Sequence, residues 1–260
     1  MRGAGDGAAC RVEGVSKAFG AVRAVRDVSF AVEPGSLTCL IGPNGAGKST
    51  LLHCISGFLR HDAGRIEIEG TDVSRWPAHR RARNGLGTVF QTTRPLERLD
   101  VWTNAMVGCH AWTRSDFLAG ILRPPRQRRE EREIREASRE ALALVGLEQR
   151  LLDAADALPI GQLRLLSIAR VLAQRPRVLL LDEPVAGLRA AEKRQLTTVF
   201  RDLRERGLTQ VLVEHDMQFV GSVADRVIVL DRGAVIADGP PEQVRGDERV
   251  ISAYLGTAVL

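Results

Sequence analysis

The sequence predicts an α/β fold: a mostly parallel sheet covered by helices, preceded by an antiparallel β subdomain and interrupted by a helical insert. Two observations support this. Apolar and polar residues alternate with period two through about the first seventy residues, which is typical of half-buried strands. Toward the C-terminus, short apolar runs alternate with helical patterns, which indicates parallel strands joined by helices.

The individual elements follow from these two periods. Expected strands are Cys10–Val15, Val25–Val32, Leu37–Ile41, Arg65–Glu69, Gly87–Gln91, Arg177–Leu181, Thr209–Val213, Val227–Leu230 and Val235–Asp238. Expected helices are Thr50–Leu59, Arg126–Val145, Ser167–Ala173, Ala190–Arg206 and Phe219–Ala224. We expect one domain over residues 10–257, with the helical insert at about 92–166 and a flexible tail at 1–9.

Composition limits the class of protein. With 260 residues and 44% hydrophobic content, the chain can bury a full core without disulfides or metal. The four cysteines (Cys10, Cys39, Cys54 and Cys109) show no paired spacing, so we expect reduced, buried thiols. No apolar run is long enough to span a membrane and the start does not resemble a signal peptide, which predicts a cytosolic protein. The net charge of +5 is scattered among acidic residues, which argues against nucleic-acid binding.

A glycine-rich loop lies between the strand Leu37–Ile41 and the following helix. It reads Gly42-Pro43-Asn44-Gly45-Ala46-Gly47-Lys48-Ser49-Thr50, a match to the phosphate-binding pattern GxxxxGK[ST]. The glycines let backbone N–H groups surround phosphates, and the helix N-terminus adds positive potential. Lys48 is expected to neutralise phosphate oxygens and Ser49 to ligate Mg²⁺. The strand–loop–helix order predicts a P-loop, RecA-like core that binds ATP with Mg²⁺.

A second apolar strand ends in two acids, Asp182 and Glu183. The carboxyl ends of strands in α/β sheets are where ligands bind, so both acids should lie beside the phosphates. We expect Asp182 to hold Mg²⁺, directly or through water, and Glu183 to orient and deprotonate the attacking water.

With these motifs in place, the chain resembles the nucleotide-binding subunits of ABC transporters, from about Val12 to Gly256. The resemblance implies three further site residues. Gln91 would reach the metal and the attacking water, and His215 would contact the γ-phosphate. Phe19 would stack on the adenine ring.

The family's signature segment is matched in part. It reads Leu158-Pro159-Ile160-Gly161-Gln162. In the resemblance, Leu158, Gly161 and Gln162 would contact the nucleotide held by a second subunit, so function needs a dimer with two ATP molecules. Pro159 replaces a serine and Ile160 a glycine, although proline suits the first turn of a helix.

A further departure is Arg189, at a position that usually carries Asp or Asn and faces the other subunit in the family. All three departures affect groups given to the partner's site, whereas the residues around the chain's own nucleotide are intact. The sequence therefore favours a heterodimer with unequal sites, with a homodimer as the alternative.

Less universal stretches are similar to the ATP-binding subunits of branched-chain amino acid importers. They are Phe19–Val25, His110–Arg114, Glu214–Met217 and Val250–Gly256. The resemblance implies permease subunits, a second ATP-binding subunit, a periplasmic or extracellular binding protein and a place on the cytoplasmic face of the membrane. It also implies permease docking beside Gln91 and the segment Thr92–Val107.

Other functions are possible from the same sequence. They include an ATPase of urea or amide import or of lipopolysaccharide export, and a regulatory half of a heterodimer with weak hydrolysis. A single-cassette chain without a coiled coil argues against a repair or translation ATPase. A small-molecule kinase would explain neither Leu158–Gln162 nor His215. Cargo identity rests on resemblance alone, because an ATPase subunit does not touch the cargo.

Overall fold

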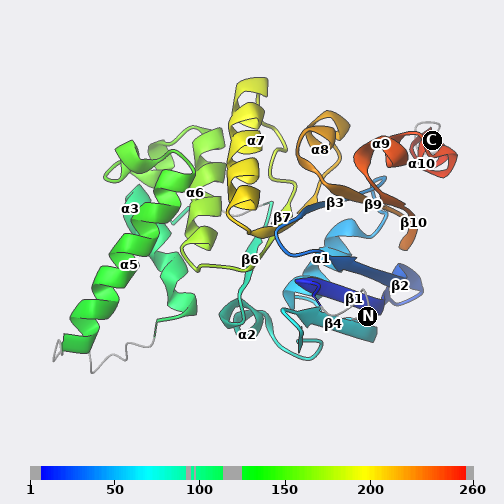
Figure 1. The fold of residues 1–260 in the computed structure, drawn as a ribbon, viewed down its shortest axis with the longest axis horizontal. Coiled ribbons are helices and arrows are strands. Elements are labelled where there is room, and N and C mark those ends of the chain that lie inside the picture. Colours follow the sequence, from blue (N-terminus) through cyan, green and yellow to red (C-terminus); the bar gives the residue numbers. More distant parts are fainter. Residues whose placement is uncertain (1–6, 92–94, 97, 114–124, 256–260) are drawn as a thin grey trace. The chain divides into compact units, whose positions relative to one another are not determined.

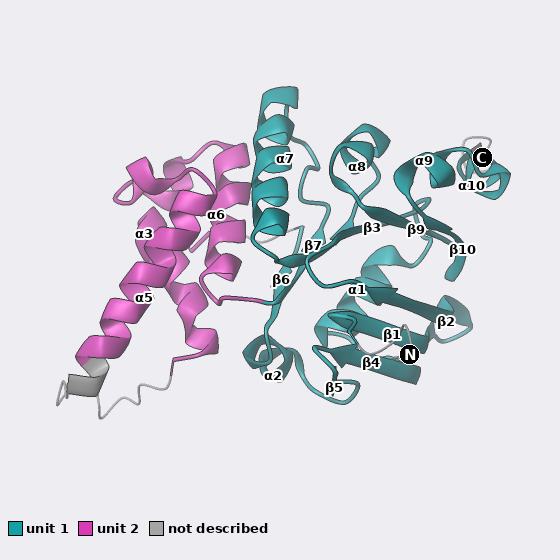
Figure 2. Cartoon of the chain, in the orientation of Figure 1, with its two compact units in different colours: residues 1–91, 177–260 teal, residues 92–176 magenta. Residues whose placement is uncertain are grey.

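The computed structural model describes residues 7–91, 95–96, 98–113 and 125–255, and its contacts divide the chain into two compact units (Figure 2). Unit 1 comprises Met1–Gln91 and Arg177–Leu260, and unit 2 comprises Thr92–Pro176. Unit 2 therefore begins where the sequence places the insert but ends later than residue 166. The reason is that helix α6 (Ile160–Leu172) packs against α3 (Val101–Met106) and α5 (Pro125–Leu144) of the same unit.

The N-terminal strands of unit 1 form an antiparallel sheet, as predicted. Its order is β2 (Val22–Val32), β1 (Cys10–Phe19), β4 (Ala63–Ile68) and β5 (Thr71–Asp72). Ala9, which the sequence placed in the flexible tail, is buried and joins this sheet. Its N–H donates to Val32 at 2.9 Å and its carbonyl accepts from Glu69 at 2.9 Å. Residues 1–6 of that expected tail lie outside the described residues.

The second sheet of unit 1 carries the candidate site. It comprises β10 (Ala234–Gly239), β9 (Arg226–Asp231), β3 (Leu37–Ile41), β8 (Thr209–Val213), β7 (Val178–Asp182) and β6 (Leu86–Val89), in that order. The five strands from β9 to β6 are parallel, and β10 is antiparallel to β9. Every residue of β3, β7 and β8 is buried, including polar residues such as Thr38 and Gln210, which indicates a sheet covered on both faces.

Helices complete unit 1 (Figure 1). They are α1 (Lys48–Ser56), α2 (Ala78–Arg83), α7 (Ala190–Glu205), α8 (Met217–Val223), α9 (Pro241–Arg245) and α10 (Glu248–Leu255). Helix α1 contacts β1 and β2 of the antiparallel sheet and β7 and β8 of the parallel sheet. Its Leu51, Leu52 and Ile55 are fully buried in one apolar core with residues of both sheets. This packing fixes the start of α1 beside the glycine-rich loop.

Helix α1 differs from its predicted range, Thr50–Leu59, at both ends. Gly57 takes a left-handed conformation (φ 79°) that stops the helix after Ser56. The carbonyls left open there are partly satisfied by Arg81, a 2% exposed side chain whose guanidinium donates to Cys54 and Ile55 at 2.8 and 2.7 Å. A cation at the negative end of the helix is electrostatically favourable.

Unit 2 is helical, as predicted. Besides α3, α5 and α6 it contains the 3₁₀ helices η1 (Val107–Ala111), η2 (Glu148–Arg150) and η3 (Ala155–Ala157). Asn104 is fully buried and binds the residues before α3. Its amide donates to the carbonyls of Leu96, Leu99 and Asp100. Helix α5 carries an i,i+4 ion pair from Arg135 to Glu131, at 2.7 Å.

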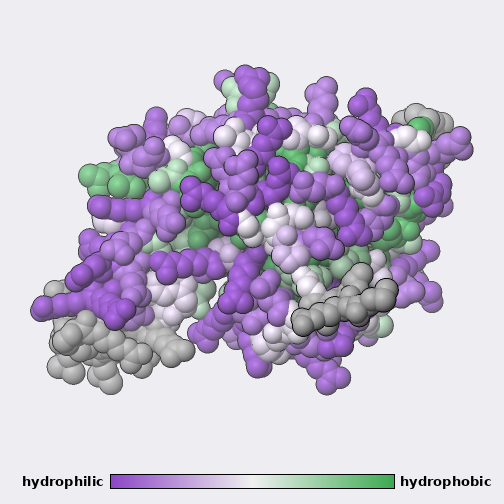
Figure 3. All heavy atoms as spheres, viewed as in Figure 1, coloured by the Kyte–Doolittle hydropathy of each residue, from purple (hydrophilic) through white to green (hydrophobic). Residues whose placement is uncertain are grey.

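Hydrophilic side chains cover most of the face drawn in Figure 3, over both units. All four cysteines are buried and free, as predicted from their spacing. Of the helices that the structure describes, none is both long and apolar enough to cross a bilayer.

Candidate nucleotide site

The glycine-rich loop joins β3 to α1 along the edge at which the parallel strands end. Gly42 (φ 147°) and Gly47 (φ 99°) pass so close to other backbone that a Cβ would lie 2.0 Å from the carbonyl oxygen of Leu230 and 2.1 Å from that of Ala24, respectively. Gly45 (φ 79°) instead faces open space, and Asn44 beside it is exposed. The loop therefore packs against other backbone at Gly42 and Gly47 and is open to solvent at Gly45. This arrangement leaves room for phosphate groups.

Lys48 begins α1 and is 7% exposed. Its ammonium donates to the carbonyls of Gly42 and Pro43 at 2.8 and 2.9 Å. Burial lowers the pKa of Lys48, and the charges of Glu183 and Asp182 partly oppose that shift. A buried cation bound to neutral carbonyls is favourable for an anionic ligand, because phosphate oxygens would offset its desolvation.

Asp182 is the last residue of β7 and is 7% exposed. Its Oδ1 lies 3.5 Å from the Ser49 hydroxyl. Burial raises the pKa of Asp182, and repulsion from Glu183 adds to it. A divalent cation at these oxygens would offset both effects. Among the described residues no cluster of three or more His, Cys, Asp or Glu could hold a metal by itself. Mg²⁺ commonly binds one or two carboxylates together with phosphates, so Asp182 and the Ser49 hydroxyl fit Mg²⁺ beside a bound phosphate.

Three side chains expected near the γ-phosphate converge on one another in unit 1. Gln91, which follows β6, donates from Nε2 to Glu183 Oε2 at 2.7 Å. His215, which follows β8, places Nδ1 3.9 Å from Glu183 Oε1. They meet because β6, β7 and β8 are adjacent parallel strands whose carboxyl ends share one edge.

Glu183 has an unusual backbone conformation for a residue with a side chain, with φ at 47° in the left-handed region. Its N–H nevertheless donates to the carbonyl of Val213 at 2.9 Å, so the strained residue is held against β8. Strained residues of this kind persist when the surroundings hold them in place, and they gather at functional sites.

Phe19 ends β1 and is 51% exposed. The Lys17 ammonium lies 5.4 Å from the centre of its ring and is itself bound to Asp62 at 2.7 Å. A large exposed aromatic supported by a cation offers a surface on which a flat base could stack.

The signature segment lies in unit 2, at the start of α6. Pro159 is the N-cap, with no side-chain cap, and Ile160 begins the helix 60% exposed. Leu158 and Gly161 are buried. Helix α6 therefore begins seven residues before the predicted helix start at Ser167, and proline is compatible with this earlier start.

Arg189 is the N-cap of α7 in unit 1. Arginine has no acceptor atom, so its side chain cannot cap the helix. Only half of a capping box forms, in which the Arg189 N–H donates to the Glu192 carboxylate at 2.8 Å. The residue that departs from the family pattern thus leaves the start of α7 under-capped.

One buried acid was missed by the sequence interpretation. Glu214 follows β8 and is completely buried, and its carboxylate accepts from the backbone N–H of Val185 and of His215. Burial raises its pKa, and these two hydrogen bonds oppose the shift. The signal was present, because Glu214 directly follows strand β8 in the same way as Glu183 directly follows strand β7.

Two sequence families match the chain. The one described as ABC transporter matches residues 25–186, and the one described as branched-chain amino acid ATP-binding cassette transporter matches residues 234–259.

Individual relatives match over nearly the whole length. The high-affinity branched-chain amino acid transport ATP-binding protein BraF of Pseudomonas aeruginosa is 40% identical, over 95% of this chain and 97% of the relative. LivG of Escherichia coli, which carries the same description, is 36% identical over the same shares. The crystal structure of the ADP conformation of MJ1267, an ATP-binding cassette of an ABC transporter, superposes with a TM-score of 0.84 and 30% identity, covering 96% of this chain and 99% of that one.

Proposed function

The chain belongs to the ABC transporter family, and from that premise we propose that it binds and hydrolyses ATP to power an importer of branched-chain or other hydrophobic amino acids. The observation that carries the hydrolytic part is the convergence of Gln91, Glu183 and His215 at the edge that also holds Lys48. The cargo is inferred from the names of the relatives and from the match over residues 234–259.

The proposed chemistry assigns a role to each side chain. Lys48 and the loop backbone bind the β- and γ-phosphates. Glu183 accepts a proton from the attacking water, and Gln91 orients that water through the same carboxylate. His215 donates to the γ-phosphate as negative charge shifts during transfer. Phe19 stacks on the adenine.

The metal would be held by Ser49, Asp182 and Gln91. When bound, Mg²⁺ neutralises charge on the phosphate oxygens. The residues of the chain then serve to position the metal, and the Ser49 hydroxyl and Asp182 Oδ1 lie 3.5 Å apart, near one site.

The importer assignment implies partners. We propose that the chain works on the cytoplasmic face of the membrane with permease subunits, a second ATP-binding subunit and a periplasmic or extracellular binding protein. Permease docking beside Gln91 and residues 92–107 is part of the proposal, and residues 92–94 and 97 of that segment lie outside the described residues.

The decisive experiment is Glu183→Gln. The change keeps the shape of the side chain and removes the base, so ATP hydrolysis should fall at least ~100-fold while ATP binding is retained. Glu205→Gln, at the exposed end of α7, is the matched control and should hydrolyse ATP at the wild-type rate. If the Glu183 variant hydrolyses ATP normally, the chain is not an ATPase of this type.

The heterodimer follows from Pro159, Ile160 and Arg189, which occupy the positions given to the partner's site. We propose that this subunit completes its partner's site poorly. Purification of the chain alone and with a paralogous ATP-binding subunit tests the idea, since the mixed complex should hydrolyse ATP faster. Full cooperative turnover by the chain alone would contradict it.

A further inference from the structure

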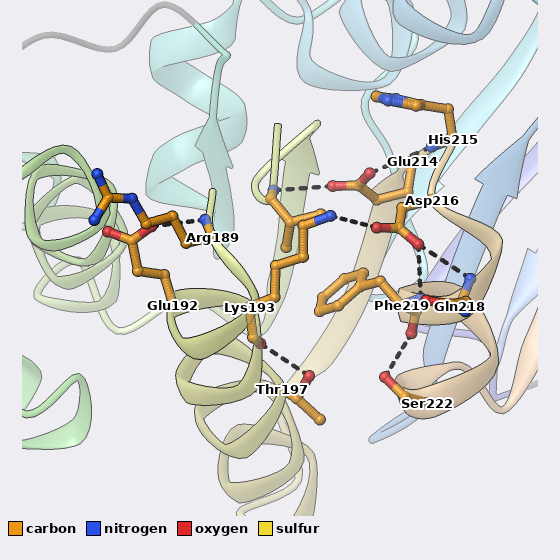
Figure 4. A network of polar contacts seen from close by, with 11 residues as sticks. Arg189, Glu192, Lys193, Thr197, Glu214, His215, Asp216, Gln218, Phe219 and Ser222 are labelled. Atoms are coloured by element: carbon orange, nitrogen blue, oxygen red, sulfur yellow. Dashed lines mark hydrogen bonds and ion pairs between the residues drawn. The ribbon is translucent and has the colours of Figure 1, made fainter. Parts of the chain in front are cut away.

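His215 lies in the short loop between β8 and α8, and both of its neighbours are bound to the segment that begins at Glu183. That segment runs from the end of β7 through a bend into the first turns of α7. Figure 4 shows the side chains of α7 and of the His215 loop meeting between these elements. The contacts connect the surroundings of Glu183 and His215, two of the residues on which the proposed hydrolysis depends.

The first connection is made by Glu214, the residue before His215. One carboxylate oxygen accepts from the Val185 N–H at 3.0 Å and the other from the His215 N–H at 3.3 Å. Both donors are backbone amides, so an ionised carboxylate matches them and a glutamine would present its own NH₂ to one of them. Because Glu214 is completely buried, losing either bond would leave a polar group without a partner.

The second connection is made by Asp216, the residue after His215. Its Oδ1 caps α8 by accepting from the N–H groups of Gln218 and Phe219 at 3.1 and 3.0 Å. Its Oδ2 accepts from the Lys193 ammonium of α7. Since the first oxygen is fixed on the end of α8, the second presents a fixed target to Lys193.

Helix α7 is joined to the chain around α8 by another ion pair, at the far end of α7. Arg204 donates to Asp225 at 2.6 Å, and Asp225 precedes β9 instead of adjoining His215. Both pairs join α7 to the chain around α8, and Phe200 also packs edge-on against Phe219. The two ion pairs differ in one respect: the Lys193 pair anchors a residue next to His215, and the Arg204 pair does not.

We infer that Lys193 and Glu214 are positioning residues that hold His215 at its place beside Glu183. The inference rests on the proposed ATPase function. Glu214, the residue before His215, is bound to the segment that follows Glu183, and Lys193 binds the residue after His215 to the same segment. Together these two contacts hold His215 Nδ1 3.9 Å from Glu183 Oε1. ATP binding depends instead on the glycine-rich loop and Lys48, so loosening either anchor should slow hydrolysis without weakening binding.

The test is Lys193→Met in the full-length chain, with hydrolysis followed in single turnover and ATP affinity measured separately without Mg²⁺. We expect the rate to fall about tenfold, since displacement of a positioned group by an ångström can cost up to ~100-fold, and the Kd to stay within about twofold. Asp216→Asn should act alike, because asparagine still caps α8 but lacks the charge. Lys193→Arg should recover most of the rate.

Further variants separate this role from simple loss of stability. The double variant of Lys193→Met and Asp216→Asn should be no slower than either single one, because both break the same contact. Arg204→Met removes the matched ion pair at the other end of α7 and should hydrolyse ATP normally. Glu214→Gln should slow hydrolysis by a second route, and thermal melting curves show that each variant is folded.

Failure of the positioning role can be distinguished from failure of the ATPase function. If the wild type hydrolyses ATP, Glu183→Gln does not, and Lys193→Met matches the wild type, the positioning role is wrong and the ATPase function stands. Equal slowing by Arg204→Met would also overturn the positioning role. If the wild type does not hydrolyse ATP, or if Glu183→Gln does so normally, the ATPase function fails and the inference fails with it.

Discussion

The carboxyl edge of the parallel sheet and the starts of helices α6 and α7 differ in how firmly their polar groups are held. At the sheet edge, Lys48 and Asp182 are buried. The Lys48 ammonium donates to the Gly42 carbonyl, and the Glu183 carboxylate accepts from Gln91. At the helix starts, Pro159 and Arg189 provide no side-chain cap. Ile160 is 60% exposed.

This contrast follows the family pattern. The residues of the proposed nucleotide site match the family pattern, and other parts of unit 1 hold them in place. The residues that depart from the family lie where this chain does not constrain them. The lesson is that a contact made within the chain restricts a residue, whereas a contact offered to a partner leaves no trace in the isolated subunit.

The carboxyl edge of the parallel sheet can be disrupted at Gly47, in the glycine-rich loop. An added Cβ would lie 2.1 Å from the Ala24 carbonyl oxygen, at a φ of 99° that side chains rarely adopt. Gly47→Ala should therefore destabilise the chain by about 3 kcal/mol and weaken ATP binding. Urea unfolding and nucleotide titration measure the two effects.

Gly45→Ala is the matched control. It also has a positive φ, 79°, but no atom lies within 4 Å of the added Cβ. Its cost should be limited to backbone strain, about 1 kcal/mol. Equal losses at Gly45 and Gly47 would show that strain, and not close approach, governs this loop.

The start of helix α7 can be stabilised at Arg189. Arg189→Asp supplies a side-chain acceptor at the N-cap of α7, where Glu192 already forms the other half of a capping box. We expect a gain of about 1 kcal/mol in the free energy of unfolding, seen as a higher urea midpoint. Ile160→Ala, at the exposed start of α6, should change stability by less than ~0.5 kcal/mol. A loss of stability in the Arg189 variant would contradict the capping argument.

The smallest expected effect concerns the ion pair of Lys193 with Asp216. The hydrogen bond from Lys193 lowers the pKa of Asp216 below 3.8. A lowered pKa in the folded state means that the contribution to stability is present above 3.8 and is lost as the pH falls through the folded value. The wild type should thus exceed Asp216→Asn by about 0.5 kcal/mol at neutral pH. Urea unfolding at several pH values should show the difference shrinking as the pH falls below 3.8, whereas a constant difference would rule out the ion pair as its source.

Much of the fold could be predicted because its signals are local. The strands Leu37–Ile41 and Thr209–Val213 agree with β3 and β8 residue for residue, since short, mostly apolar runs that follow turn residues favour strands. The C-terminal end of α1 was missed because the stop depends on Gly57 adopting a left-handed conformation. The later end of unit 2 depends on packing of α6 that no local pattern shows.

By itself the sequence determined the glycine-rich loop, the acids at the end of β7 and the family resemblance. The matches confirm the family. These depend on residue type and spacing along the chain. Only the tertiary structure decided that Gln91, Glu183 and His215 meet, that Glu214 is buried between two backbone amides, and that Lys193 reaches Asp216. These contacts join residues from separate strands and helices, and their distances exist only after the sheet has assembled.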